Sequence, residues 1–203
     1  ITSGTFLNGL IHIGNSHFPA GRMGEKPSIG LSEALKEHGF TLGRLKTGTP
    51  PRLDKNSIDW DQAARLEHDI NPSPFSLYTK KPDFIKQEFC YSVQSNKKLH
   101  DIVLDNLQSS AMFSGRINAV GPRYCPSVED KIHRFSSRPS HQFFLEPEWS
   151  NSEQIYLGGF STSLPQQVQI KALKTISALK NVRLIRPGYA IEYDYSPPYQ
   201  LTS

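Results

Sequence analysis

Cysteines and long apolar runs are scarce in this chain, which excludes several classes of protein. Two cysteines, Cys90 and Cys125, occur in 203 residues, far apart and without a C-x-x-C pair. A disulfide framework and a cysteine-based zinc site are therefore not expected. No stretch approaches the roughly 20 apolar residues of a membrane-spanning helix, so we expect no membrane span.

Metal-ligand spacing and an initiator methionine are also missing. None of the seven histidines stands in an H-x-x-x-H or similar pattern, so no metal site is expected. The chain begins at Ile1 and shows no signal or transit segment. We interpret it as an internal piece of a longer protein, inactive by itself.

The composition is that of a globular protein with a mildly basic surface. Hydrophobic residues make up 36% of the chain and charged residues 21%, and no internal repeat is visible. The length suits one large domain or two small ones. The net charge of +4 is compatible with an RNA partner, although many proteins without a nucleic-acid role are equally basic.

Strands and helices alternate loosely, which predicts an α/β or α+β fold. Pro27-Ser28 is predicted to open a helix that Gly39 ends. Apolar residues at helical spacing predict helices at 96–107 and at 165–179, the latter capped by Ser163. Residues 55–86 are predicted to be a long excursion with little regular structure. Strands are predicted on either side of a turn at Asn8-Gly9, and then at 40–46, 89–93, 141–145, 154–157, 182–185 and 190–193.

The stretch Gly121–Phe135 is the most informative segment. Cys125 lies between the pair Arg123-Tyr124 and a proline, and cationic neighbours favour the thiolate, which is the nucleophilic form. The same residue type is more often a small buried hydrophobe, so the spacing alone leaves both interpretations open.

Two other segments have a functional and a structural interpretation. The glycine loop 20–24 leads to a predicted helix start at Ser28. This arrangement could bind a phosphate, or it could be an ordinary turn before a capped helix. The turn at Pro50-Pro51 is rigid, and its basic neighbours suit a polyphosphate, an RNA backbone or solvent. These neighbours are Arg44, Lys46, Arg52 and Lys55.

Several segments together resemble the large flavoprotein of the tRNA wobble-uridine modification system, the MnmG/GidA family. They occur in the family's order from about residue 2 to about residue 195. The segments are TSGTFLNG (Thr2–Gly9), AGRMGEKPSIGL (Ala20–Leu31), GRLKTGTPPRLD (Gly43–Asp54), GPRYCPSVEDKIHRF (Gly121–Phe135), HQFFLEPE (His141–Glu148), STSLP (Ser161–Pro165) and RPGYAIEYDY (Arg186–Tyr195).

The resemblance implies an α/β fold with two parts. Residues 1–50 and the return segment 189–203 would belong to a Rossmann-like FAD-binding domain. Residues 51–188 would form an inserted α/β domain that binds NAD(H) and substrate. The dinucleotide fingerprint G-x-G-x-x-G is absent, and in the family it lies nearer the N-terminus, as expected for a partial chain.

The resemblance also implies an activity. The full enzyme would modify the wobble uridine of tRNA at C5 together with a GTPase partner, using FAD, NADH and methylenetetrahydrofolate as one-carbon donor. A homodimer is expected, and departures from the usual bacterial wording near Cys90 and at 196–198 favour a mitochondrial version over the bacterial cytoplasm.

The implied site residues follow the family motif position by position. Cys125 is the catalytic candidate, whereas Cys90, where the family usually continues I-T-H-T-N, is expected to be a packing residue. Ser28 is implied as an FAD contact. The nicotinamide contacts implied are Gly121, Pro122, Arg123, Tyr124, Cys125, Pro126, Ser127, Val128, Glu129, Asp130, Lys131, Ile132, His133, Arg134 and Phe135.

Two rival functions remain open at this stage. One is a related flavoprotein that methylates tRNA uridine with methylenetetrahydrofolate. The other is a fragment that binds RNA or a partner protein without catalysis.

Overall fold

The computed structural model describes residues 2–67, 69, 73–79, 88–121 and 125–201. These residues form a mixed α/β fold, which confirms the fold class expected from the sequence. The α-helices are α1 (Leu31–Glu37), α2 (Lys97–Asp105), α3 (Val128–Arg134) and α4 (Gln166–Leu173). The strands are β1 (Leu10–Ile13), β2 (Ser16–Pro19), β3 (Gly43–Thr49), β4 (Arg52–Asp54), β5 (Ala64–Arg65), β6 (Tyr91–Gln94), β7 (Gln142–Pro147), β8 (Gln154–Gly158), β9 (Leu184–Arg186) and β10 (Tyr189–Tyr195).

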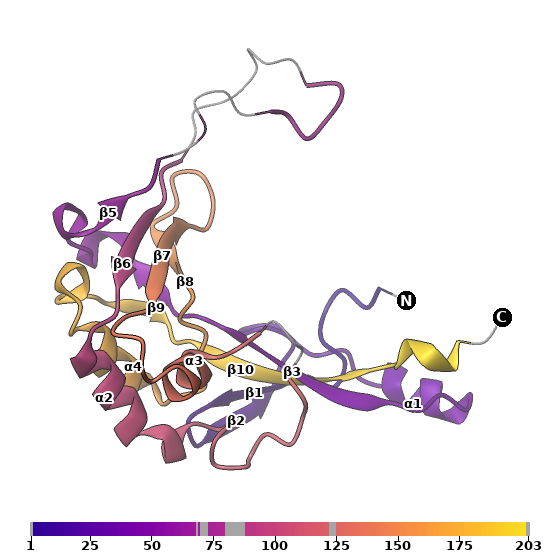
Figure 1. Ribbon diagram of the computed structural model, residues 1–203. Helices are drawn as coiled ribbons and strands as arrows, with labels where there is room; N and C mark the ends of the chain where they lie inside the picture. The colour runs from indigo at the N-terminus through magenta and orange to yellow at the C-terminus, as the bar shows by residue number, and fades with distance from the viewer. Residues whose placement is uncertain (1, 68, 70–72, 80–87, 122–124, 202–203) are drawn as a thin grey trace.

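The strands form two sheets whose named pairs are all antiparallel. A four-stranded sheet has the order β2-β1-β10-β3, and a six-stranded sheet has the order β5-β6-β7-β8-β4-β9. Figure 1 shows α1 and both chain ends at one end of the molecule, with the six-stranded sheet at the other. The first sheet therefore combines the beginning and the end of the chain, and the second contains its middle.

The chain passes between the sheets twice, at adjacent places. Strand β3 continues through Pro50-Pro51 into β4, and β9 continues through Pro187-Gly188 into β10, while β3 pairs with β10 and β4 with β9. Proline cannot donate a ladder hydrogen bond, so these breaks are natural points for a strand to leave one sheet for another. The two sheets divide at 50–51 and at 187–188.

A glutamine from α4 holds this crossing. The fully buried Gln169 side chain accepts a hydrogen bond from the Gly188 N–H at 2.7 Å and donates to the Gly188 carbonyl at 2.9 Å. It also donates to the Leu164 carbonyl at 2.8 Å. The break between β9 and β10 leaves the Gly188 N–H and C=O without partners on a neighbouring strand. The Gln169 side-chain amide supplies the hydrogen bonds that such a strand would make.

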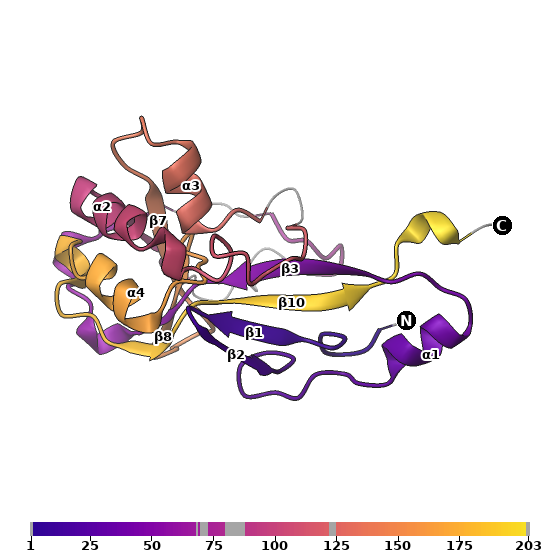
Figure 2. The same ribbon diagram turned by 90° about the horizontal axis from the view of Figure 1, so that it is seen from below.

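The main core lies between the six-stranded sheet and three helices. Figure 2 shows α2, α3 and α4 together at the end of the molecule away from α1. Asn96 caps α2 by accepting a hydrogen bond from the Leu99 N–H at 2.9 Å, and α2 buries Leu99 and Val103 completely. Phe143 and Phe160 pack edge to face beneath the helices with ring centroids 5.3 Å apart. Each such fully buried side chain stabilises the fold by about 2–3 kcal/mol.

Several predicted boundaries are wrong for identifiable reasons. Helix α1 begins at Leu31 rather than at Pro27, because Ser28 is held in a parallel bridge beside Leu7 and Gly30 adopts a φ of 90°. The first hairpin turns at Gly14 instead of Asn8-Gly9. Helix α4 ends at Leu173, well before the predicted residue 179.

Ser163 does not cap α4, because its hydroxyl and N–H belong to a buried polar cluster. Glu129 of α3 has no exposed surface, and its Oε1 accepts hydrogen bonds from the Ser163 N–H at 3.0 Å and from the Ser110 hydroxyl at 3.1 Å. Burial raises the pKa of the Glu129 carboxyl, and the backbone donor of Ser163 opposes that shift. This cluster ties α3 to the loops that precede α3 and α4.

Replacing Gly188 tests the crossing. A Cβ at this position would lie 2.9 Å from Thr162 Cγ2, 3.0 Å from the Thr49 carbonyl oxygen and 3.2 Å from Pro51 Cδ. We expect Gly188→Ala to lower the free energy of unfolding by about 1–3 kcal/mol through overpacking, measured by urea denaturation. Gly48→Ala, whose Cβ would meet only ordinary contacts, is the control, and equal stability of both variants would contradict this account.

Glu129 variants test the buried cluster. Glu129→Ala removes the acceptor of the buried Ser163 N–H and one partner of the Ser110 hydroxyl, and it should lower the free energy of unfolding by about 2–4 kcal/mol. Because the folded-state pKa of Glu129 is raised, its stabilising contribution is complete below the ordinary carboxyl pKa and is lost as the pH rises through the folded value.

Glu129→Gln keeps an acceptor but cannot ionise. Its stability relative to the unsubstituted protein should therefore improve as the pH increases from about 5 to about 8. A constant difference across that interval, measured by urea denaturation, would show that Glu129 does not titrate as its burial requires.

Candidate functional site

Cys125 lies at the edge of the four-stranded sheet. The segment before it runs beside β3, where Val120 forms a parallel bridge with Leu45 and its carbonyl accepts the Lys46 N–H at 3.0 Å. The Cys125 sulfur lies 3.2 Å from the Thr47 hydroxyl oxygen. The thiol is partly exposed, so it is not sealed in the hydrocarbon core.

Helix α3 follows the cysteine at once and orients it. Ser127 caps the helix, accepting the Asp130 N–H at 3.2 Å, while the Asp130 carboxylate accepts the Ser127 N–H at 3.2 Å. The Val128 N–H also donates to the Ser161 carbonyl at 2.7 Å. This reciprocal cap fixes where the chain turns from Cys125 into the helix.

Charged and phenolic groups surround the thiol. The half-buried Lys131 donates from Nζ to the Gly159 carbonyl at 3.2 Å. Burial lowers the pKa of the Lys131 ammonium, and the nearby Cys125 acts in the opposite direction because a thiolate favours a charged lysine. Burial also raises the pKa of Tyr156 and Tyr193, and the charge of Cys125 adds to that rise in both.

A narrow cleft adjoins the cysteine between the four-stranded sheet and the loops that precede α3 and α4. It offers about 10 Å³ of water-accessible space, which is room for about one water molecule. Four residues with hydroxyl groups and one lysine are among those that line it. The lining residues are Lys46, Gly48, Met112, Cys125, Ser127, Ser161, Thr162, Ser163 and Ala190.

The basic residues of the GRLKTGTPPRLD segment have different environments. Arg44 pairs with Asp194 at 2.7 Å, and Arg52 pairs with Glu148 at 2.6 Å while stacking on Tyr156. Both guanidinium groups therefore hold the fold together. Lys46 is buried and borders the cleft.

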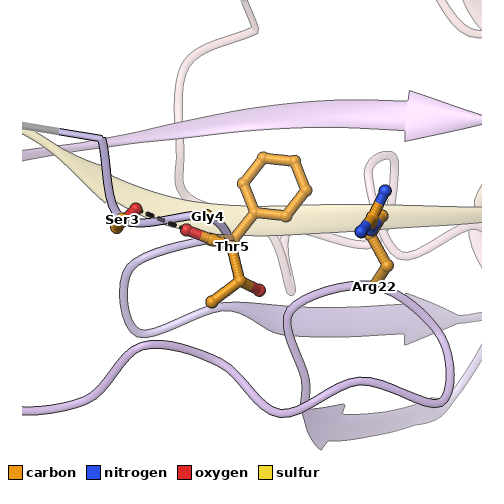
Figure 3. Close-up of a pocket in the computed structure, with 5 residues that line it drawn as sticks. Ser3, Gly4, Thr5 and Arg22 are labelled. Atoms are coloured by element: carbon orange, nitrogen blue, oxygen red, sulfur yellow. Dashed lines mark hydrogen bonds between the residues drawn. The ribbon is translucent and has the colours of Figure 1, made fainter.

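A larger pocket lies on the first sheet. It has about 380 Å³ of water-accessible space and is lined by Ser3, Gly4, Thr5, Phe6 and Arg22. Figure 3 shows Arg22 across the pocket from the 3–5 turn, in which the Ser3 hydroxyl donates to the Thr5 carbonyl at 2.6 Å. Ser28 is adjacent, because its N–H donates to the Phe6 carbonyl at 2.9 Å.

Tyr193 links the pocket to the cysteine. Its ring centroid lies 4.7 Å from that of Phe6, a residue that lines the pocket. Burial raises the pKa of the Tyr193 phenol, and the charge of Cys125 adds to that rise.

The other predicted site residues have diverse positions. Pro122, Arg123 and Tyr124 lie outside the described residues. Gly121 and Pro126 are exposed beside the cleft, whereas Val128 and Ile132 belong to the core. The remaining three residues are exposed at the C-terminal end of α3: His133, Arg134 and Phe135. The His133 ring packs edge to face against Phe113.

Sequence reasoning missed part of the site. Thr47, Tyr156, Tyr193 and the hydroxyls of 161–163 come from segments distant in the chain. The motifs KTGTPPR, STSLP and RPGYAIEYDY contain most of them, so the recurrence of hydroxyl residues within those motifs was the available signal.

Cys90 has the environment of an unreactive thiol. It is half-buried, and burial raises its pKa, with the carboxylate of Glu146 adding to the effect. Among the described residues no cluster of His, Cys, Asp and Glu could hold a metal ion. Within those same residues, no helix has the length and apolarity needed to cross a bilayer.

The expected mitochondrial origin is wrong. The relatives at about 50% identity are bacterial proteins, which favours the bacterial alternative. The departures that suggested a mitochondrial version lie at Cys90, before β6, and at Ser196 and Pro198, which are exposed beyond β10. Loop positions vary readily among homologues, so they say little about compartment.

Comparisons with known proteins agree on one family. The model of the family described as "Glucose inhibited division protein A" matches residues 1–203. A Cytophaga hutchinsonii protein named "tRNA uridine 5-carboxymethylaminomethyl modification enzyme MnmG" is 50% identical over 99% of this chain and 32% of its own length. A protein of the same name from Chlorobium phaeovibrioides is 51% identical over 99% of the chain and 32% of its own length.

The solved structures have the same fold. Aquifex aeolicus GidA superposes with a TM-score of 0.87 at 46% identity, covering 97% of this chain and 34% of that one. The mixed α/β architecture is consistent with the Rossmann-like FAD-binding fold of the family. The chain spans about a third of the length of the relatives that it matches, and it belongs to the GidA family.

Proposed function

We propose that this chain forms part of an FAD-dependent enzyme that modifies uridine in tRNA. The names of the relatives support this activity. The observation that supports it within the chain is the arrangement around Cys125. The partly exposed sulfur lies 3.2 Å from the Thr47 hydroxyl, close to Lys131 and beside a hydroxyl-lined cleft.

We further propose that Cys125 activates the uracil ring. Its thiolate adds to C6, the S–C6 bond forms, and the C5=C6 electron pair moves so that C5 becomes nucleophilic. Once C5 has bonded to its new substituent, loss of the C5 proton and expulsion of the sulfur restore the ring. The Thr47 hydroxyl, whose oxygen lies 3.2 Å from the sulfur, donates a hydrogen bond to the thiolate in this step.

We assign part of the FAD site to the pocket on the first sheet. Its wall of backbone and hydroxyl groups at 3–5, together with the guanidinium of Arg22, suits a large polar ring system, and Ser28 adjoins it. Bound there, FAD would supply redox chemistry. Gly4 has a φ of 72° and no atom near its absent Cβ, which leaves the wall open to a close approach.

The finer parts of the function rest on the resemblance to the family. We propose that the target is C5 of the wobble uridine, with NADH bound at Gly121–Phe135, methylenetetrahydrofolate as the carbon source, a GTPase partner and a homodimeric assembly. We also propose that 1–50 and 189–203 belong to the FAD domain and that 51–188 is the inserted domain. The division of the sheets at 50–51 and at 187–188 supports this partition.

Replacing Cys125 in the full-length protein tests the proposed role. We expect Cys125→Ser to lower uridine modification by about 10³-fold or more, because a serine hydroxyl is a far weaker nucleophile, while FAD absorbance is retained. Cys90→Ser is the matched control and should modify normally. Mass spectrometry of digested tRNA measures the product, and wild-type yields from Cys125→Ser would refute the catalytic role.

Replacing Thr47 tests the hydrogen bond to sulfur. Thr47→Val keeps the shape but removes the hydroxyl, so we expect about a tenfold lower modification rate. Thr47→Ser keeps the hydroxyl and should retain most of the rate. Equal single-turnover rates for the valine and serine variants would show that this contact does not assist Cys125.

A further inference from the structure

Lys46 is a buried lysine without a counter-charge among the described residues. It is 3% exposed, and its side chain borders the cleft that Cys125 also lines. A Cβ at Gly121 would lie 3.8 Å from Lys46 Nζ, so the ammonium lies against the backbone of the segment leading to Cys125. No hydrogen bond or ion pair of Nζ occurs within the described part of the chain.

The carboxylate opposite Lys46 on the neighbouring strand has another partner. Glu192 stands opposite Lys46 in the register of β3 and β10. However, its Oε2 lies 2.7 Å from His12 Nε2, and the two side chains form a buried pair. Arg44 and Arg52, on either side of Lys46 in the chain, both have carboxylate partners, so the lack of one at Lys46 is specific to this position.

An unpaired buried ammonium is costly, because it gives up hydration without a compensating charge. Several residues with hydroxyl groups line the cleft beside Lys46. A second ammonium group, that of Lys131, lies near Cys125. Such a setting is preorganised for negative charge that appears only when a ligand reacts.

We infer that Lys46 stabilises the oxyanion that forms on the uracil ring during thiolate addition. This inference rests on the proposed function. When the S–C6 bond forms, the C5=C6 pair moves into the C4–C5 bond, and the C4 carbonyl pair moves onto O4 as an enolate. No oxidant or reductant is consumed, and expulsion of the sulfur reverses every shift. Lys46 is thus a catalytic residue that contacts O4, distinct from the nucleophile Cys125.

The experiment uses the full-length protein with FAD and a tRNA carrying tritium at C5 of the target uridine. Addition at C6 lets C5 exchange its hydrogen with water, so tritium release reports the step without any carbon donor. We expect Lys46→Met to lower tritium release and uridine modification by about 10²-fold or more, the loss typical of removing one oxyanion donor. Lys171→Met, an exposed lysine of α4, is the control and should behave as wild type.

Stability and flavin readouts separate catalysis from structure. Because methionine removes a buried unpaired charge, we expect Lys46→Met to have an equal or higher Tm and unchanged FAD content. A lower Tm would indicate an ion pair with a part of the protein outside this chain, and loss of FAD would indicate a flavin contact. Either result would overturn the inference, as would tritium release at the wild-type rate.

A second variant and the wild-type protein complete the test. If Lys46→Met does not fold, Lys46→Gln replaces it, and failure of both would assign Lys46 a structural role and overturn the inference. Wild-type protein that modifies no tRNA uridine would refute the proposed function itself. Wild-type protein that modifies uridine without releasing tritium before the carbon donor is added would refute the addition step, and the role of Lys46 with it.

Discussion

The double crossing between the sheets is the constraint on which the site depends. Two chain segments connect the sheets side by side in opposite directions, and Gly188 fits against Thr49 and Pro51 with no room for a Cβ. Gln169 satisfies both backbone groups of Gly188 at that point. Because the cleft beside Cys125 is lined by residues of β3, β10 and the loop before α4, its width is set by this packing.

Charge is distributed unevenly around the crossing. The guanidinium groups of Arg44 and Arg52 are neutralised by carboxylates and bind the sheets and loops together. The ammonium groups of Lys46 and Lys131 are buried or half-buried without such partners among the described residues. The carboxylates in this region thus pair with the structural arginines. The unpaired positive charge lies beside the thiol, where it can stabilise negative charge that develops in a reaction.

Local sequence signals predicted the presence of helices and strands better than the residues at which they begin and end. The helix at α2 was expected from apolar spacing and was found, whereas its cap at Asn96 became evident only in the structure. The start of α1 was misplaced, because a proline-serine pair is a helix signal only when the backbone is free, and Ser28 is bound beside Phe6. Ser163 was expected to cap α4 but instead joins Glu129, a tertiary contact that no local pattern contains.

The sequence by itself determined the family, the mixed α/β class and the prominence of Cys125, because motifs and hydrophobic periodicity are written in local order. Only the tertiary structure decided which basic residue of the KTGTPPR segment lacks a partner, and which hydroxyl groups face the sulfur. Those outcomes depend on contacts between segments far apart in the chain, such as Thr47 with Cys125 and Arg52 with Glu148. Whether a charge is paired is a property of three-dimensional neighbours and of burial, and neither is encoded at a single position of the chain.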